Sequence, residues 1–285
     1  MKRWILFISL VLVGNYGLNA QLLWKISGKG LKNSSYILGT HYLIPLVYID
    51  SIKQVYKSFN ECDLVLGEVV TNSIDAKSYL EKTSLLPSNE SLYTYIPLDK
   101  QQIVNQELKS VLKIGLKELS RMQPELILRL YKSELFKQQT GVEDDAQSDS
   151  YFQIAANAKD IKVIAFSTLE EQMKESFHAN TQEQTDILVN ALIQKKRMSE
   201  KLLQFNQLYR GGKIEDLQFI DASFVSTVNK PDRQFEIKTD KIFNTINQII
   251  QKNSCFISVD VFRLSGENSL IKQLTQAGYK VKAVE

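Results

Sequence analysis

The sequence predicts an α/β (mixed α+β) protein with a single domain, in which a mixed sheet is flanked by many helices. Short β-branched or aromatic runs alternate with longer stretches of helical periodicity along the chain. No low-complexity linker divides the sequence, and 285 residues, 44% of them hydrophobic, suffice for one large core. A strand-loop-helix pattern near the start returns near the end, so the domain is predicted to contain two pseudo-repeated halves.

The first half covers residues 35–59. It opens with an apolar run typical of a short buried strand, which breaks at Gly39 and is followed by Thr40 and His41. Pro45 suits the first turn of a helix predicted to reach the end of this segment. Because ligands collect at the carboxyl ends of strands in open α/β sheets, Thr40 and His41 are placed where a site is expected.

The second half lies between residues 255 and 276. A β-rich run covers residues 255–259, the segment 260–264 takes the place of the Gly39 loop, and a helix is predicted from Asn268 to Gln276. Two such halves are expected to face each other across one site.

The first 20 residues have the order of a secretory signal peptide. Two basic residues open the segment, an apolar stretch follows, and the small residue Ala20 precedes the expected first mature residue, Gln21. The apolar part is shorter than the ~20 residues that a membrane span needs. We therefore expect residues 1–20 to be removed and residues 21–285 to form a periplasmic or secreted domain of the bacterial envelope. An uncleaved N-terminal anchor is the alternative.

Charge excludes nucleic acid as an expected partner. The formal charge of +3 falls to +1 when Lys2 and Arg3 are removed with the signal segment. The one compact basic run, residues 195–197, lies within a helical pattern and is followed by Glu200, as expected of a solvated helix face. No later segment is apolar for long enough to form a membrane span after signal cleavage.

The remaining elements follow from periodicity, caps and turn residues. In chain order they are a strand at 22–27 joined through Gly28-Lys29-Gly30 to the strand at 35–38 as a hairpin, a strand at 64–70, helices at 99–112, 123–138 and 150–158, a buried strand at 162–166, a helix that begins at the capping box 168–171, a helical stretch at 181–209 ended by Gly211-Gly212, a helix at 239–251 and a terminal strand at 279–284. The acidic loop 142–149 is expected to be solvated, and His178 to be a surface or structural histidine.

Glu68 is the one charged residue inside the strand predicted at 64–70. A carboxylate in that position is costly unless it is paired, hydrogen-bonded or close to solvent. A structural salt bridge and a role in a functional site both satisfy this requirement.

Two cysteines, Cys62 and Cys255, stand at the starts of predicted buried strands. In an oxidising compartment they could form a disulfide if these strands are neighbours, and free buried thiols are the alternative. The sequence contains no Cys-x-x-Cys or other zinc-like spacing.

Five segments carry a family resemblance: Leu22–Gly28, Ser35–Leu43, Asp63–Glu68, Tyr209–Gly212 and Arg263–Asn268. They resemble the TraB/GumN family, whose relatives include the TIKI metalloproteases, and together they span nearly the whole mature chain. The resemblance implies a single α/β domain with a pseudo-repeated half. It also implies a metal-dependent peptidase site made of two Gly-x-x-His motifs, a strand glutamate and an arginine in a late helix.

Carried over position by position, the resemblance assigns Glu68 as the strand glutamate. In the first motif Gly39 is present, but Tyr42 stands at the histidine position and His41 lies one residue earlier.

The second motif departs further from the family pattern. Asp260 takes the glycine position, Arg263 takes the histidine position, and Lys238 stands where the late-helix arginine is expected. Both motif histidines are therefore replaced.

Two functional hypotheses follow. In the first, the chain is an exported, non-catalytic member of the family that needs no cofactor. Its crevice, lined by Tyr42, Lys238, Asp260 and Arg263, holds an anionic or peptide ligand against Glu68.

The alternative is a metal-dependent peptidase of the TIKI type. A catalytic zinc-type site needs three protein ligands and an open position for water. His41 and Glu68 would bind zinc or manganese and carry the catalysis, with Asp260 as a third donor. Arg263 opposes this arrangement, because it places a permanent positive charge next to the position of the cation.

Overall fold

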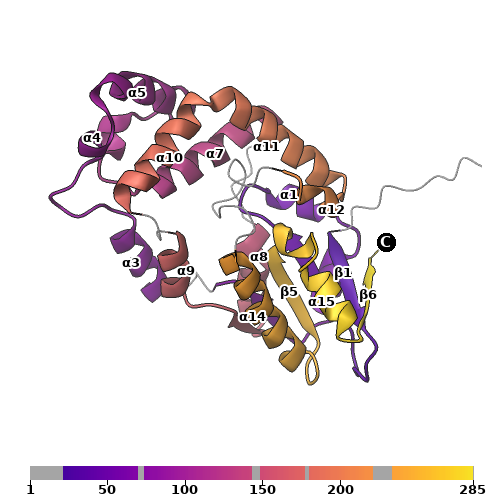
Figure 1. Cartoon of the computed structure of the whole chain (residues 1–285). Coiled ribbons are helices and arrows are strands. Elements are labelled where there is room, and N and C mark those ends of the chain that lie inside the picture. The colour runs from indigo at the N-terminus through magenta and orange to yellow at the C-terminus, as the bar shows by residue number, and fades with distance from the viewer. Residues whose placement is uncertain (1–21, 70–73, 143–147, 177–179, 221–232, 285) are drawn as a thin grey trace, which may run out of the picture.

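A computed structural model of the chain describes residues 22–69, 74–142, 148–176, 180–220 and 233–284 (Figure 1). The predicted signal peptide at 1–20, most of the acidic loop 142–149 and His178 lie outside the described residues.

The described residues form one mixed sheet of six strands in the order β4-β3-β5-β2-β1-β6. The strands are β1 Leu23–Ser27, β2 Ser35–Thr40, β3 Leu64–Gly67, β4 Lys162–Ala165, β5 Cys255–Asp260 and β6 Lys280–Ala283. The four strands from β4 to β2 are parallel, β1 pairs antiparallel with β2, and β6 pairs antiparallel with β1, so that β1 alone runs opposite to the other five strands of this sheet. The predicted single α/β domain with a mixed sheet is confirmed.

The predicted hairpin is also confirmed. β1 pairs with β2 so that Leu23 lies opposite Leu38, and all three turn residues have positive φ, at 80° for Gly28, 49° for Lys29 and 79° for Gly30. Glycine adopts such angles at little cost, which lets the chain reverse sharply here.

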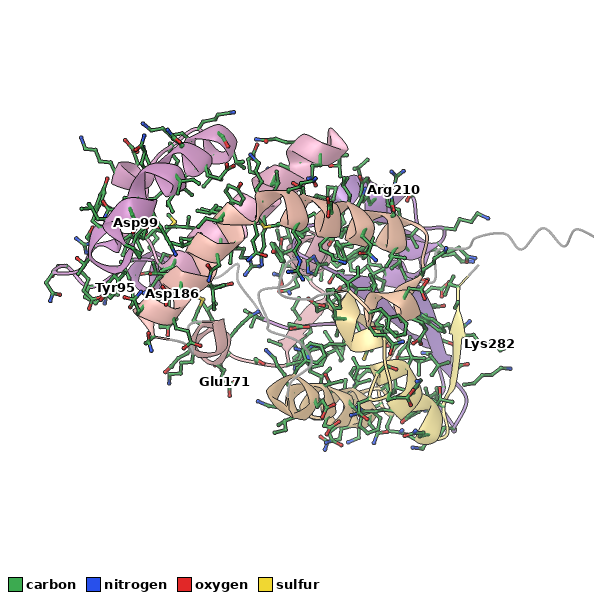
Figure 2. The ribbon with its side chains drawn as sticks, turned by 45° about the horizontal axis from the view of Figure 1, so that its top comes forward. Tyr95, Asp99, Glu171, Asp186, Arg210 and Lys282 are labelled. Carbon is green, nitrogen blue, oxygen red and sulfur yellow. The ribbon has the colours of Figure 1, made fainter. Side chains whose placement is uncertain are left out.

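The two outer strands differ from the buried inner ones. β6 exposes Lys280 and Lys282, and Figure 2 shows Lys282 on the outward side of the strand. Exposed lysines of this kind discourage pairing with another sheet. β4 forms the opposite edge, where Lys162 is exposed and the other three residues are partly exposed. The strand predicted at 162–166 is thus present, but the prediction that it is buried is wrong, because β4 has a neighbour on one side only.

Helices make up most of the rest of the described chain. They are α1 Leu46–Asp50, α2 Val55–Asn60, α3 Ile74–Thr83, α4 Leu92–Tyr95, α5 Leu98–Leu112, α6 Leu116–Leu119, α7 Pro124–Thr140, α8 Ser148–Asn157, α9 Leu169–Ser176, α10 Thr181–Ile193, α11 Lys195–Arg210, α12 Ile214–Leu217, α14 Arg233–Ile249, the 3-10 helix η1 Val261–Leu264 and α15 Leu270–Gln276.

Three predicted helices have different bounds. The first is divided between α1 and α2, because Gln54 adopts a left-handed φ of 62°. The long stretch 181–209 breaks at Gln194 into α10 and α11. The helix predicted from residue 239 begins earlier, at Arg233. Periodicity located all three segments but did not show where the backbone turns.

Several helix ends follow from local sequence as predicted. Pro124 occupies the first turn of α7, and Gly141 ends that helix with a left-handed φ of 69°. The predicted capping box before α9 is present, because Glu171 N–H donates to Thr168 Oγ1 at 3.1 Å and Thr168 N–H donates to Glu171 Oε2 at 2.9 Å.

The helices form two groups around the sheet (Figure 1). α14 and α15 cover one face of the sheet, and α8 lies behind the other. On α8, Phe152 is fully buried, with ring centroids 4.6 Å from Phe256 of β5 and 5.4 Å from Phe59 of α2. The second group, α4, α5, α7, α10 and α11, forms a curved helical layer that extends away from the sheet.

The two pseudo-repeated halves meet inside the sheet. β2 and β5 are neighbouring parallel strands, with Thr40 opposite Asp260. Gly39 leaves room for η1, since a Cβ there would lie 2.9 Å from side-chain atoms of both Val261 and Leu264. The loop after each half therefore emerges at the same point of the sheet edge.

Both cysteines are buried free thiols in the structure. Burial raises the pKa of the Cys62 thiol and raises that of Cys255 to about 12. Thiols in such surroundings are protonated and unreactive at neutral pH.

Candidate functional site

The candidate site lies at the carboxyl ends of β3, β5 and β2, where three neighbouring parallel strands release polar residues. β3 ends at Gly67 and not at residue 70 as predicted, so Glu68 is the first residue beyond the strand. Asp260 is the last residue of β5, and Thr40, the last residue of β2, donates its hydroxyl to the carbonyl of Val259 at 3.2 Å.

Glu68 and Arg263 form an ion pair at this edge. Glu68 Oε1 accepts a hydrogen bond from Arg263 Nε at 2.9 Å and another from the backbone N–H of Asp260, also at 2.9 Å. The side chain of Arg263 is 3% exposed and that of Glu68 is 19% exposed. The carboxylate of Glu68 is therefore both paired and hydrogen-bonded, which is what a charged group at this strand end requires.

Helix α14 holds the other side of the Arg263 guanidinium. Nη1 donates to Thr239 Oγ1 at 2.9 Å and to the carbonyl of Phe235 at 3.4 Å. The guanidinium carbon also lies 4.4 Å from the centroid of the Phe235 ring. Arg263 is thus fixed between a carboxylate, two oxygen acceptors and an aromatic face, which are the partners that a buried guanidinium requires.

The pKa of Glu68 lies below its ordinary value of 4.5. Burial alone would raise it, but the charges of Arg263 and Lys238 and the hydrogen bonds from Arg263 and Asp260 outweigh burial. The carboxylate is therefore ionised at neutral pH and forms a true ion pair with Arg263.

Asp260 and Lys238 contribute to the same place in different ways. Asp260 Oδ1 accepts from the backbone N–H of Phe262 at 2.9 Å and so caps η1, the helix that carries Arg263. Lys238 is partly buried on α14, and its charge acts on Glu68. The structure thus brings together four of the predicted site residues: Glu68, Lys238, Asp260 and Arg263.

His41 lies in a separate, aromatic environment. It is 1% exposed, and its ring centroid is 4.7 Å from those of Tyr42 and Phe205 and 5.8 Å from that of Phe262. Its Nδ1 accepts from the backbone N–H of Leu43 at 3.3 Å. In neutral imidazole the proton then belongs on Nε2, an atom that is buried and has no hydrogen-bond partner.

The pKa of His41 is lowered from 6.5 to about 3. Burial is the main cause, and the positive charges of Arg129 and Lys132 on α7 add to it. The imidazole is therefore neutral throughout the physiological range of pH.

Tyr42 is buried next to His41 and faces α7. The guanidinium carbon of Arg129 lies 4.6 Å from the centroid of the Tyr42 ring. Burial is the main cause that raises the pKa of Tyr42, so its phenol keeps its proton at any physiological pH.

These donors do not fit a metal ion. The part of the chain that the structure describes contains no group of three His, Cys, Asp or Glu side chains placed to share one cation. Glu68 is bonded to Arg263, Asp260 caps η1, and His41 packs among aromatic rings. We therefore derive no reaction step through zinc or manganese.

Sequence reasoning missed Arg129 and Lys132. Both lie on α7, a helix that packs against α10, α11 and α5. Lys132 is only 1% exposed, and this burial follows from tertiary packing that helical periodicity does not show. Glu125, Arg129 and Lys132 follow the i, i+4, i+7 spacing that places side chains on one helix face.

The fold and the site define a class of protein: a single α/β domain whose polar groups gather where the strands of two repeated halves end. Comparison with known proteins agrees, because the model of the TraB/PrgY/gumN family matches residues 22–283. The chain belongs to this family. No curated protein and no solved structure matches the chain significantly. Among the described residues, no helix combines the length and apolar character needed to cross a membrane.

We expect Glu68→Gln to lower the free energy of unfolding by about 3 kcal/mol, because it leaves the buried guanidinium of Arg263 without its counter-charge. Urea unfolding at pH 7 measures this change. The matched control is Glu267→Gln, which removes a 93% exposed carboxylate that lies 3.0 Å from Lys272. An exposed pair contributes little, so the control should change stability by less than about 0.5 kcal/mol. Equal effects would show that Glu68 is not held in the pair described.

A second prediction concerns pH. Below pH 6.5 an unfolded chain protonates residue 41, whereas the folded chain does not until about pH 3. Stability from the neutral imidazole is therefore complete above pH 6.5 and is lost as pH falls towards 3, by up to about 1.4 kcal/mol per pH unit. His41→Asn removes this titration and keeps an acceptor for Leu43.

Urea unfolding of both proteins between pH 4 and 8 provides the measurement. The advantage of the unaltered protein over His41→Asn should be constant above pH 7 and shrink below pH 6. Parallel stability curves down to pH 4 would contradict the buried, neutral state of His41.

Proposed function

We propose that this chain is an exported, non-catalytic member of the TraB/PrgY/gumN family that binds an anionic or peptide ligand at the carboxyl ends of β2, β3 and β5. The observation that carries this proposal is the 2.9 Å bond between Arg263 Nε and Glu68 Oε1. This ion pair engages the carboxylate of Glu68, which a metal-dependent reaction would need as a ligand.

The chemistry of arginine makes this arrangement unfavourable for a catalytic metal. A guanidinium cannot be deprotonated in a protein, so it can neither serve as a ligand nor lose its repulsion towards a cation. Three further partners fix Arg263 in place. For Glu68 to bind a metal, it would have to leave a buried cation uncompensated.

Charge supports an anionic ligand. Among the described residues, the charges that act on Glu68, His41 and Tyr42 are those of four cations against three carboxylates, namely Arg129, Lys132, Lys238 and Arg263 against Glu68, Glu125 and Asp260. One positive charge therefore remains in excess. In a site that is largely shielded from water, such an excess attracts a negatively charged group more strongly than it would at the surface.

Metal binding tests the proposal. We expect purified protein to retain far less than one equivalent of zinc or manganese by elemental analysis, and to hydrolyse no amide bond in a peptide mixture. Changing Tyr42→His together with Arg263→His should raise zinc affinity more than either change alone, because each supplies one ligand of a shared site. Calorimetric titration measures the affinities.

The matched control for added histidines is Tyr48→His with Arg210→His. Tyr48 and Arg210 form a similar tyrosine–arginine stack, with 4.9 Å between guanidinium carbon and ring centroid, at another place on the protein. This control adds two histidines away from Glu68 and His41, so it should gain less zinc affinity than Tyr42→His with Arg263→His. Stoichiometric, tightly held metal in the unaltered protein, with peptide hydrolysis that Glu68→Gln abolishes, would overturn the proposal in favour of the metallopeptidase.

Export has its own test. We expect protein recovered from the periplasm of a Gram-negative host to begin at Gln21, because the basic, apolar and small-residue segments follow in the order that signal peptidase reads. Intact mass and N-terminal sequencing measure this. Ala20→Phe should slow the cleavage, since the position before the cut requires a small residue. Protein that still begins at Met1 in that fraction would contradict export with cleavage.

A further inference from the structure

The excess positive charge is unevenly divided over the candidate site. At the β3 and β5 ends, Glu68 and Asp260 balance Arg263 and Lys238. On α7, Arg129 and Lys132 face the His41 loop with Glu125 as the carboxylate on the same helix face. An anion is therefore attracted to the α7 side of the site and not to Arg263, whose charge Glu68 already compensates.

Arg129 is oriented in a way that suits recognition of a carboxylate. Its guanidinium stacks on the ring of Tyr42, with 4.6 Å between carbon and ring centroid. Stacking engages the face of a guanidinium and leaves the N–H donors at its edge, which match the two oxygens of a carboxylate. Arg129 is also partly exposed, whereas Arg263 is 3% exposed.

His41 gives an independent sign that an acceptor belongs here. Its Nε2 is buried without a hydrogen-bond partner, although Nδ1 is bonded to Leu43 N–H. Leaving a buried donor unpaired is unfavourable, and most such groups in proteins are satisfied by a partner, water or an ion. The charges that act on this imidazole are those of Arg129 and Lys132, so the unsatisfied donor and the cations occupy one region.

We propose that Arg129, Lys132 and the Nε2–H group of His41 bind a carboxylate group of the ligand, whereas Arg263 only holds Glu68. This inference rests on the proposed function and names the ligand chemistry and the residues that recognise it. Lys132 also interacts with other groups of the protein, and its role here is to add positive charge beside His41. The donor set carries one net positive charge with Glu125 included, which favours a monocarboxylate over a phosphate dianion.

Binding requires some movement of side chains, because Nε2 is closed to solvent in the structure. The stack of Arg129 on Tyr42 is a cation–π contact, which is weak when the cation is partly exposed. A carboxylate that bonds to Arg129 and reaches His41 replaces this contact with charge-assisted hydrogen bonds, which are stronger.

The experiment uses the mature chain labelled with ¹⁵N-histidine and titrated with sodium acetate at constant ionic strength, with sodium chloride as the balancing salt. The chain has two histidines, so His178→Asn assigns the signals of His41. We expect acetate to shift the Nε2 signal of His41 saturably and sodium phosphate to shift it at least tenfold more weakly. Arg129→Gln should weaken acetate binding at least tenfold.

The matched control is Arg210→Gln. Arg210 is an exposed arginine at the end of α11 that stacks on Tyr48, and Figure 2 shows it at the outer surface. This control should change acetate affinity less than twofold. Arg129→Lys keeps the positive charge but not the planar guanidinium, so its affinity for acetate should lie between that of the unaltered protein and that of Arg129→Gln. It also keeps the test valid if Arg129→Gln unfolds, which circular dichroism would reveal.

Two results would overturn the inference. One is the absence of a saturable shift at His41 in the unaltered protein. The other is acetate binding that survives Arg129→Gln but is lost in Lys238→Gln. That result would place the carboxylate on the α14 side of the site, and the proposed binding function would still hold. Failure of the proposed function itself would be seen separately, as stoichiometric metal with peptide hydrolysis.

Discussion

The ion pair between Glu68 and Arg263 joins three parts of the chain that are far apart in sequence. It connects the end of β3 to η1 and, through the hydrogen bonds of Arg263, to α14. A buried guanidinium is tolerated only with a counter-charge and with acceptors for its N–H groups, and all of them are present here. The arrangement of the site edge therefore depends on this pair.

The pair also decides what chemistry the rest of the site can perform. Because Arg263 compensates Glu68, the carboxylate is an electrostatic anchor and no longer a donor for a cation. The ring centroid of Phe262, the neighbour of Arg263 on η1, lies 5.8 Å from that of His41. The same helix thus lies between a balanced ionic cluster and a neutral histidine whose pKa is lowered by burial and by the cations of α7.

Sequence patterns predicted the strands, the hairpin, most helices and the meeting of the two halves, because these depend on periodicity and turn residues that are local. They also predicted that Glu68 would need a cation beside it. They could not predict Arg129 and Lys132, since α7 approaches His41 only through tertiary packing. Nor could they show that β4 is an edge strand or that His41 is enclosed by Phe205 of α11. Contacts between distant segments are not encoded in local periodicity.

The departures from the family motifs form one consistent local structure. Asp260, in place of a glycine, donates its backbone N–H to Glu68 and caps η1 with its carboxylate. The cap fixes the start of η1, and this orients Arg263 so that its Nε reaches the same oxygen of Glu68. A carboxylate at position 260 would repel Glu68 if no cation were present, so Asp260 and Arg263 are compatible only together. Asp260 and Arg263 therefore act as a unit that orients η1 and balances the charge of Glu68 at the carboxyl ends of β3 and β5.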